Sequence, residues 1–397
     1  MKKSPLSPSM LQMYGLSIFY FTANSVLTII FPLQASSHGM PEAEIGIMMG
    51  VYMFVCMILR PWAGQMVAKH SVFTIMKWLL VGHAAALLIY VWLGVESLYA
   101  VRILQGVVTA FFSMAMQIGV AEVLRDEDRG QGMAMYSLSS VLPSLYGPAL
   151  ALLLWYQGDM TWLLLFVTTL AFLPLLFFIR SPLPKMKKTN ASFTMREMVG
   201  AIKGARHHKG LVVASVVMLI GASIFGAISA FLPLYFVTTG VGNAALYLFI
   251  QAIVVVGSRF VFRKYIPSDG KWHPKFIAIV LASSIIGTTL LALLPLIGSF
   301  IYISALFNGI ATAMLYPTLT TYISFAVPEE QRHILLGVFL SSYDLGFSMG
   351  SMMMGFVVQF MSYELMFAAC SIVGLMALFV NFTGQKGAVA VKQVSIH

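Results

Sequence analysis

The sequence predicts an all-α integral membrane protein with twelve transmembrane helices in two six-helix halves and both termini in the cytoplasm. Three observations predict this fold class. The 397 residues are 59% hydrophobic and 10% charged, whereas about a quarter of a soluble domain is charged. Twelve apolar segments approach the ~20 residues that a bilayer-crossing helix needs. The loops between them alternate between loops that contain Lys or Arg and loops that contain neither.

The apolar segments define the predicted helices in chain order. We expect spans at 10–34, 44–66, 73–94, 98–122, 134–156, 161–180, 211–237, 243–262, 276–295, 298–325, 334–360 and 363–382. The run after MKKSP is long and contains Asn24, so we expect a retained first span rather than a cleaved signal peptide. The predicted halves are 1–180 and 210–397. A basic cytoplasmic linker, 181–209, joins them, and its second half is predicted to form an interfacial helix.

The net charge is +10, and the distribution of the charged residues indicates how the chain is oriented in the membrane. Most Lys and Arg residues stand in the two tails and near or within the loops after even-numbered spans. The other loops carry only acidic residues, namely Glu42, Glu44, Glu96, Asp159 and Glu364. This is the positive-inside pattern of membrane proteins. We therefore expect the lipid bilayer, and no nucleic acid, as a partner.

The two halves repeat each other. A shift of 203 residues places Arg60 on Arg263, Gln105–Gly106 on Asn308–Gly309, and Gly147 on Gly350. Parallel six-span repeats are an architecture of transporters, in which substrate is handled near the bilayer midplane. The repeat therefore predicts a transporter.

Arg102 stands within the fourth span, in LYAVRILQGVVTA. Arg102, Gln105, Thr109 and Gln117 follow helical spacing and share one face. A central arginine costs at least ~2.5 kcal/mol in hydrocarbon, so this face must meet protein or water. Either neighbouring carbonyls satisfy a structural arginine, or the permanent cation meets a substrate carboxylate or controls a nearby acid. We favour substrate binding.

Polar residues in other spans are further candidates for that site. Asn24 lies in the first span, and Asn308, Thr312 and Tyr316 form a face of the tenth span. The repeat aligns this face with the Arg102 face. We predict that Asn24, Asn308 and Tyr316 contact substrate, although each can instead be a packing residue.

Two carboxyl groups are candidates for proton coupling. Asp344 lies on a face of small polar residues in the eleventh span. A buried carboxyl can bind and release a proton near neutral pH, because desolvation disfavours its charged form. Helix packing through hydroxyl groups is the alternative role of Asp344. Glu122, near the cytoplasmic end of the fourth span, suits a gate as well as it suits a proton carrier.

The sequence also excludes several kinds of site. It has no G-x-x-x-x-G-K-[ST] motif, which ATP-driven proteins need. No Ser/His/Asp or Cys/His set stands in a plausible aqueous site, so we expect no enzyme. Cys56 and Cys370 fall within spans and are expected to be buried thiols. His207–His208 lacks a second pair at metal-ligand spacing, so we expect neither metal nor cofactor.

These segments resemble the major facilitator superfamily over essentially the whole chain. RPWAGQMVAKHSVFTIMK, residues 60–77, is similar to the family motif between spans 2 and 3, with Ala68 where an acid is usual. LYAVRILQGVVTA matches the span-4 motif R-x-x-Q-G, and SLYGPALALLL resembles the span-5 antiporter motif. The resemblance implies the major facilitator fold. It also implies gating roles for Arg60, Gly64, Gly147 and Pro148, with a bend at Pro148.

At finer grain, the chain is similar to staphylococcal exporters of opine-type metallophores such as staphylopine. This resemblance implies a bacterial cell-membrane exporter that works by alternating access. A proton gradient would drive export of a small anionic or zwitterionic metabolite, and a carboxylate-rich substrate suits a fixed Arg102. A broad-specificity multidrug pump is the first alternative, favoured by the many Met and Phe residues. A receptor or assembly subunit that transports nothing is the second. We expect a monomer.

Overall fold

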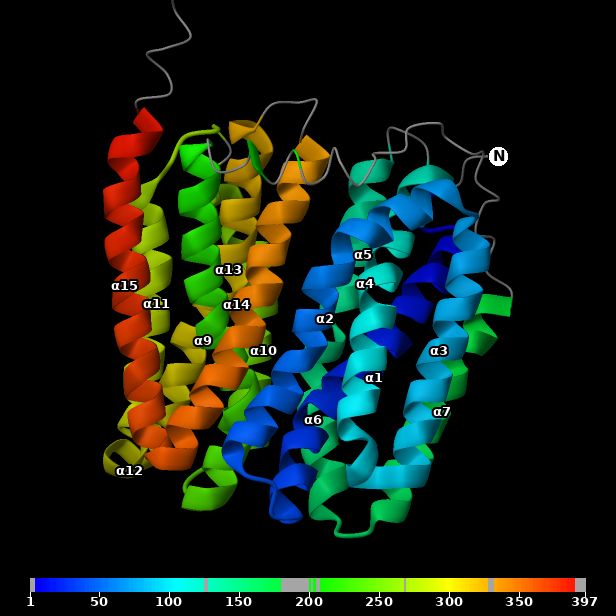
Figure 1. The fold of residues 1–397 in the computed structure, drawn as a ribbon, viewed down its shortest axis with the longest axis horizontal. Coiled ribbons are helices and arrows are strands. Elements are labelled where there is room, and N and C mark those ends of the chain that lie inside the picture. The colour runs from blue at the N-terminus through cyan, green and yellow to red at the C-terminus, as the bar shows by residue number, and fades with distance from the viewer. Residues whose placement is uncertain are drawn as a thin grey trace, which may run out of the picture. The chain divides into compact units, whose positions relative to one another are not determined.

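The computed structural model describes residues 4–124, 128–179, 200, 203–204, 208–267, 269–327 and 332–389. These residues are helical almost throughout and form two compact units (Figure 1). The N-terminal unit contains Met1–His38 and Phe54–Phe193, and the C-terminal unit contains Gly39–Met53 and Thr194–His397. The predicted all-helical fold is confirmed.

In the N-terminal unit, α1 lies against α5, α6 and α7, and α3 lies against α4 and α7. Its helices are α1 (Pro8–Ser37), the part of α2 (Glu42–Lys69) after Met53, α3 (Val72–Leu93), α4 (Leu98–Val123), α5 (Arg129–Val141), α6 (Pro143–Tyr156) and α7 (Met160–Ile179). The rings of Tyr20 and Phe112 stack in its core with centroids 3.8 Å apart. This packing places the polar face of α4 against α1.

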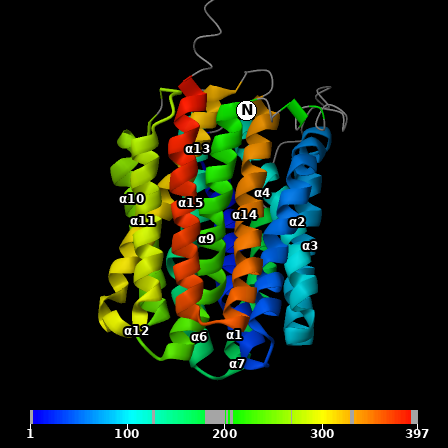
Figure 2. The same ribbon diagram turned by 60° about the vertical axis from the view of Figure 1, so that its left-hand side comes forward.

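In the C-terminal unit, α9 lies beside α14 and α15, as Figure 2 shows. Its helices are α9 (Lys209–Thr239), α10 (Ala244–Val261), α11 (Pro274–Ala292), the short α12 (Leu294–Ile297), α13 (Tyr302–Ala326), α14 (Arg332–Phe360), α15 (Tyr363–Val389) and the start of α2. Gly226 of α9 and Gly346 and Gly350 of α14 face backbone atoms of the opposite helix, where a Cβ atom has no room. Small residues thus bring α9 and α14 into backbone contact.

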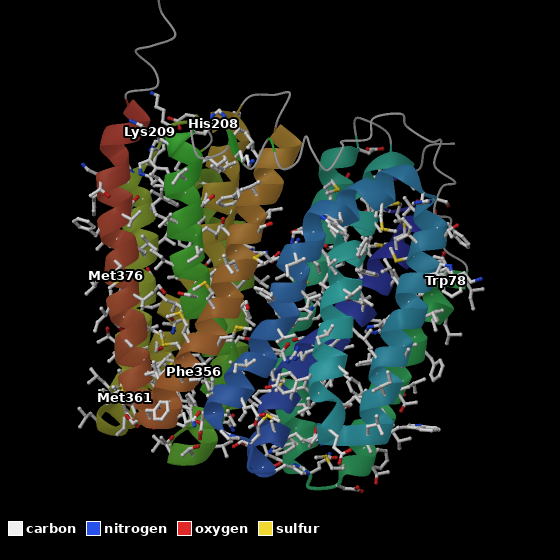
Figure 3. All side chains as sticks on the ribbon, viewed as in Figure 1. Trp78, His208, Lys209, Phe356, Met361 and Met376 are labelled. Carbon is white, nitrogen blue, oxygen red and sulfur yellow. The ribbon has the colours of Figure 1, made fainter. Side chains whose placement is uncertain are left out.

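Large apolar side chains cover the outer faces of both units. Trp78 on α3 is 65% exposed and Met376 on α15 is 57% exposed, and both lie on the outside of their helices (Figure 3). Such exposure suits a surface that faces lipid. Nine segments of the described residues are long and apolar enough to cross a membrane, and one of them, Val72–Val120, contains α3 and most of α4. The count of twelve spans and the cytoplasmic termini stay predictions.

The predicted fifth span, 134–156, is divided into two helices, α5 and α6. The division falls at Leu142, because Pro143 has no N–H to continue the helical hydrogen bonds. The interruption therefore lies before Pro148, the proline at which the sequence predicts a bend and which the structure places inside α6. Of the predicted linker 181–209, only 200, 203–204 and 208–209 are described, so most of its predicted interfacial helix lies outside the described residues.

Candidate functional site

Arg102 of α4 is buried, with 2% of its surface exposed. Its Nη2 donates to the carbonyl oxygen of Leu27 in α1 at 3.4 Å, and its Nη1 donates to Oε1 of Gln105 at 3.5 Å. The ring of Phe31, also in α1, lies 4.7 Å from the guanidinium carbon, which is cation–π range. The guanidinium therefore faces α1, and the polar face of α4 meets protein, one of the two environments that the sequence predicts for it.

Polar side chains continue from Arg102 along the contact between α1 and α4. Gln105 Nε2 donates to Oδ1 of Asn24 at 3.4 Å, and Asn24 Nδ2 donates to Oγ1 of Thr109 at 3.4 Å. The Thr109 hydroxyl shares a further hydrogen bond with the hydroxyl of Tyr20. Four of the predicted substrate-binding residues, Arg102, Asn24, Gln105 and Thr109, thus form one connected set, which we call the Arg102 ladder.

The geometry of the Arg102 ladder suits binding of an anion. Hydrogen bonds of 3.4–3.5 Å exceed the usual 2.7–3.2 Å and are weak. The guanidinium and the amides of Asn24 and Gln105 are donors of the kind that bind a carboxylate. Gln117, two helical turns beyond Thr109, is exposed and makes none of the ladder contacts. Its predicted contact with substrate stays a prediction.

Two aromatic residues around the ladder, Tyr20 and Tyr90, were not identified from the sequence. Tyr20 holds Thr109, and Phe31 covers Arg102. Tyr90 of α3 packs on Phe31 with ring centroids 4.9 Å apart. A chain with 29 Phe and 16 Tyr gives no signal for which ring meets which helix.

Asn308 is fully buried where α10, α11 and α13 meet. Its Nδ2 donates to the hydroxyl of Tyr247 at 2.9 Å and to Oγ of Ser304 at 3.2 Å. Ser304 in turn donates to the carbonyl oxygen of Gly287 at 2.8 Å. This set, the Asn308 network, joins three helices of the C-terminal unit through neutral groups. The structure thus gives Asn308 a packing role and leaves its predicted contact with substrate open.

Tyr316 of α13 and Asp344 of α14 lie elsewhere in the C-terminal unit. Tyr316 is half-buried and packs edge-on against Tyr343 of α14, with ring centroids 5.5 Å apart. Asp344 is fully buried, and Ser351 on the same helix donates to the carbonyl oxygen of Gly226 in α9. The predicted role of Asp344 stays a prediction. The side chain of Glu122, the other predicted proton carrier, lies outside the described residues.

The predicted gating residues of the N-terminal unit lie in α2 and α6. Gly147 faces the side chain of Ser25 in α1, and Ser25 donates to the carbonyl oxygen of Pro143 at 3.1 Å. Pro148 is buried beside Gly147. Arg60 is half-buried in α2, whereas the details of Gly64 lie outside the described residues. The structure thus supplies a close α1–α6 contact, and the gating roles stay predictions.

Two carboxylates outside the membrane-spanning segments have shifted pKa values. Hydrogen bonds from the backbone and side chain of Thr161 lower the pKa of Asp159. A hydrogen bond from His273 and another from the backbone N–H of Lys271 lower the pKa of Asp269. Both shifts arise from local loop contacts. Within the described part of the chain, no group of three His, Cys, Asp or Glu side chains is placed to hold a metal ion.

Comparison with known proteins gives consistent matches along the chain. The family model of the Major Facilitator Superfamily matches residues 13–299 and 271–390. The staphylopine export protein of Staphylococcus aureus (strain Mu50) is 36% identical over 384 residues, which cover 96% of this chain and 97% of that relative.

Two solved structures share the fold. A mutant of the nucleoside transporter NupG aligns with a TM-score of 0.77 at 14% identity, covering 94% of this chain and 99% of that one. The human organic anion transporter TETRAN aligns with a TM-score of 0.66 at 15% identity, covering 94% and 99% of the two chains. At this level of identity, these likenesses concern the fold alone.

Proposed function

Because this chain belongs to the major facilitator superfamily, we propose that it exports an opine-type metallophore such as staphylopine by proton-coupled alternating access. The chain is a multi-pass protein of the bacterial cell membrane, and it is a transporter rather than an enzyme. The proposal includes twelve spans with both termini in the cytoplasm. The relative named for staphylopine export supports the choice of substrate.

The Arg102 ladder is the observation that carries the proposal. Opines are secondary amines that bear two or more carboxylates. An arginine stays charged at all physiological pH values and binds a carboxylate through two parallel hydrogen bonds. The amide and hydroxyl groups of Asn24, Gln105 and Thr109 add donors and acceptors beside it. A lipophilic cation would instead be repelled by the buried guanidinium.

Asp344 is the proposed proton carrier. One charge that moves across ~100 mV releases ~2.3 kcal/mol, which supports about a 40-fold concentration gradient. Exchange of a single proton for substrate is therefore enough for export without ATP. The complete burial of Asp344 favours a carboxyl that can be neutral in one state of the cycle.

Export from a deletion strain tests the proposal. Staphylopine is measured by mass spectrometry in cells and medium for wild type, Arg102→Ala, Arg102→Lys, Asp344→Asn and empty vector. Ser140→Ala is the matched control, because its hydroxyl bonds the carbonyl of Ser137 in its own helix. We expect staphylopine to accumulate inside cells without the gene and with Arg102→Ala and Asp344→Asn. Equal membrane levels of all variants are verified by immunoblot.

Other outcomes favour the alternatives. Unchanged metabolite profiles with lower resistance to unrelated drugs would indicate a multidrug pump. If Arg102→Ala and Asp344→Asn match wild type for both metabolites and drugs, the assignment of the site to these two residues is wrong. A receptor or assembly subunit predicts that these residues are dispensable and that loss of the gene changes neither metabolites nor drug resistance. In inverted vesicles, addition of staphylopine should collapse an imposed pH gradient with wild type and leave it intact with Asp344→Asn.

A further inference from the structure

A second arginine inside the predicted spans lies in the C-terminal unit. Arg259 stands in the last turn of α10, within the predicted span 243–262. Sequence reasoning assigned the basic residues that follow this helix to topology and gave Arg259 no role. In the structure it is half-buried, within electrostatic reach of the hydroxyls of Tyr316 and Tyr343.

The environment of Arg259 differs from that of an arginine that only anchors a helix end. Such an arginine extends its guanidinium to the lipid headgroups and keeps it in water. Here Nε of Arg259 is buried, and within the described part of the chain nothing accepts its hydrogen bond. A buried donor without an acceptor is costly. A ligand that supplies the acceptor would remove this cost.

The two tyrosines within electrostatic range of Arg259 belong to two other helices. Tyr316 belongs to α13 and Tyr343 to α14, and their rings meet edge-on with centroids 5.5 Å apart. This contact fixes the two rings relative to each other. Each hydroxyl can donate one hydrogen bond. Three helices thus bring together a permanent cation and two neutral donors, a combination that selects an anion with several acceptor atoms.

We propose that Arg259, with Tyr316 and Tyr343, binds a carboxylate of the exported opine. This inference rests on the proposed function for the identity of the ligand. Each unit then carries its own anion site, at Arg102 in the N-terminal unit and at Arg259 in the C-terminal unit. An opine has at least two carboxylates, and the inference concerns the one that binds Arg259.

The test combines protein variants with ligand variants. Binding of staphylopine to the purified full-length protein in detergent is measured by titration calorimetry, as is binding of derivatives in which one carboxylate is a carboxamide. We expect Arg259→Ala to weaken staphylopine binding about 10- to 100-fold. Wild type should bind staphylopine more tightly than the derivative whose missing carboxylate is the one that Arg259 binds. We expect Arg259→Ala to bind these two compounds equally. Arg259→Lys should restore part of the affinity, and Tyr316→Phe and Tyr343→Phe should weaken it about 3- to 10-fold.

The control is Lys275→Ala, which removes an exposed positive charge from the start of α11 and should leave the affinity unchanged. Wild-type affinity in Arg259→Ala, or an equal loss for the parent and every carboxamide, overturns the inference. An effect seen only in nanodiscs of anionic lipid shows that Arg259 binds headgroups and also overturns it.

A second probe separates this inference from the proposed function. If wild type binds no staphylopine, the proposed function fails, and citrate then tests the anion site. Thermal stabilisation by citrate that is smaller in Arg259→Ala than in wild type supports the site. Undiminished stabilisation in Arg259→Ala, or no stabilisation of wild type, overturns it.

Discussion

The two halves of the chain use the same repeat position in different ways. Gln105 and Asn308 are 203 residues apart, and each places an amide group in a buried contact between helices. In the N-terminal unit, the amide of Gln105 joins the Arg102 ladder. In the C-terminal unit, Ala305 stands where the repeat would place an arginine, and the Asn308 network is neutral. The repeat thus preserves a buried amide at Gln105 and Asn308. The charge three residues before the amide is present in the N-terminal half as Arg102 and absent in the C-terminal half, where Ala305 stands.

The largest expected effect comes from imposing the missing charge. Ala305 is fully buried, so Ala305→Arg puts a guanidinium among packed helices without a counter-charge. An uncompensated buried charge costs about 3–5 kcal/mol, and we expect Ala305→Arg to fail to yield folded protein. Size-exclusion chromatography and thermal unfolding in detergent measure this, with Ala305→Leu as the control for added volume. A folded and stable Ala305→Arg would show that the two halves are interchangeable at this position.

A glycine pair extends the comparison to helix packing. Gly147 and Gly350 are also 203 residues apart. A Cβ on Gly350 meets the backbone of Ser223, whereas a Cβ on Gly147 meets the side chain of Ser25. Backbone cannot yield as a side chain can, so Gly350→Ala should cost about 3 kcal/mol and Gly147→Ala about 1 kcal/mol.

Melting temperatures of the two variants measure this difference. The double variant Gly147→Ala, Ser25→Gly tests its cause, because it removes the side chain that the new Cβ would meet. We expect it to recover part of the stability lost in Gly147→Ala. Equal losses for Gly147→Ala and Gly350→Ala would contradict the distinction between backbone and side-chain contact.

The sequence predicted the helices well and the contacts between them poorly. The predicted spans 98–122 and 243–262 match α4 and α10 within two residues, because apolar runs and their polar ends are local signals. The helical stripe also predicted that Arg102, Gln105 and Thr109 share a face. Contacts with residues on other helices could not be predicted, because they are not encoded in the local sequence. The ring of α1 that covers Arg102 and the hydrogen bond between Asn308 and Tyr247 are examples. Arg259 was missed because the basic residues that follow it in the sequence were explained by the orientation of the chain in the membrane. The tyrosines within its electrostatic range, Tyr316 and Tyr343, belong to other helices.

Substitution of Asn308 and of Gln105 should affect the folding free energy and the staphylopine affinity in opposite order. Asn308 makes hydrogen bonds of 2.9 and 3.2 Å in a fully buried network, so Asn308→Ala should cost about 2 kcal/mol of folding free energy. Gln105 makes bonds of 3.4 and 3.5 Å, so Gln105→Ala should cost under about 1 kcal/mol. For staphylopine affinity we expect the reverse order. Thermal unfolding and titration calorimetry measure the two quantities, and a loss of affinity in Asn308→Ala would restore its predicted contact with substrate.

The smallest expected effect concerns a histidine that both halves share. His70 and His273 are aligned by the repeat, but only His273 has a carboxylate partner one turn before it, Asp269 at 2.8 Å. The pKa of Asp269 is lowered by this contact, so its stabilising contribution is present above the unfolded-state pKa of about 3.9 and disappears as pH falls through the folded-state value. Both side chains are exposed, and solvent screening keeps the contribution small.

Asp269→Asn should therefore lower the melting temperature slightly at pH 7, and the difference from wild type should vanish in acid. His70→Ala is the control without a carboxylate partner at the aligned position, and a difference for Asp269→Asn that grows as pH falls would contradict the assignment.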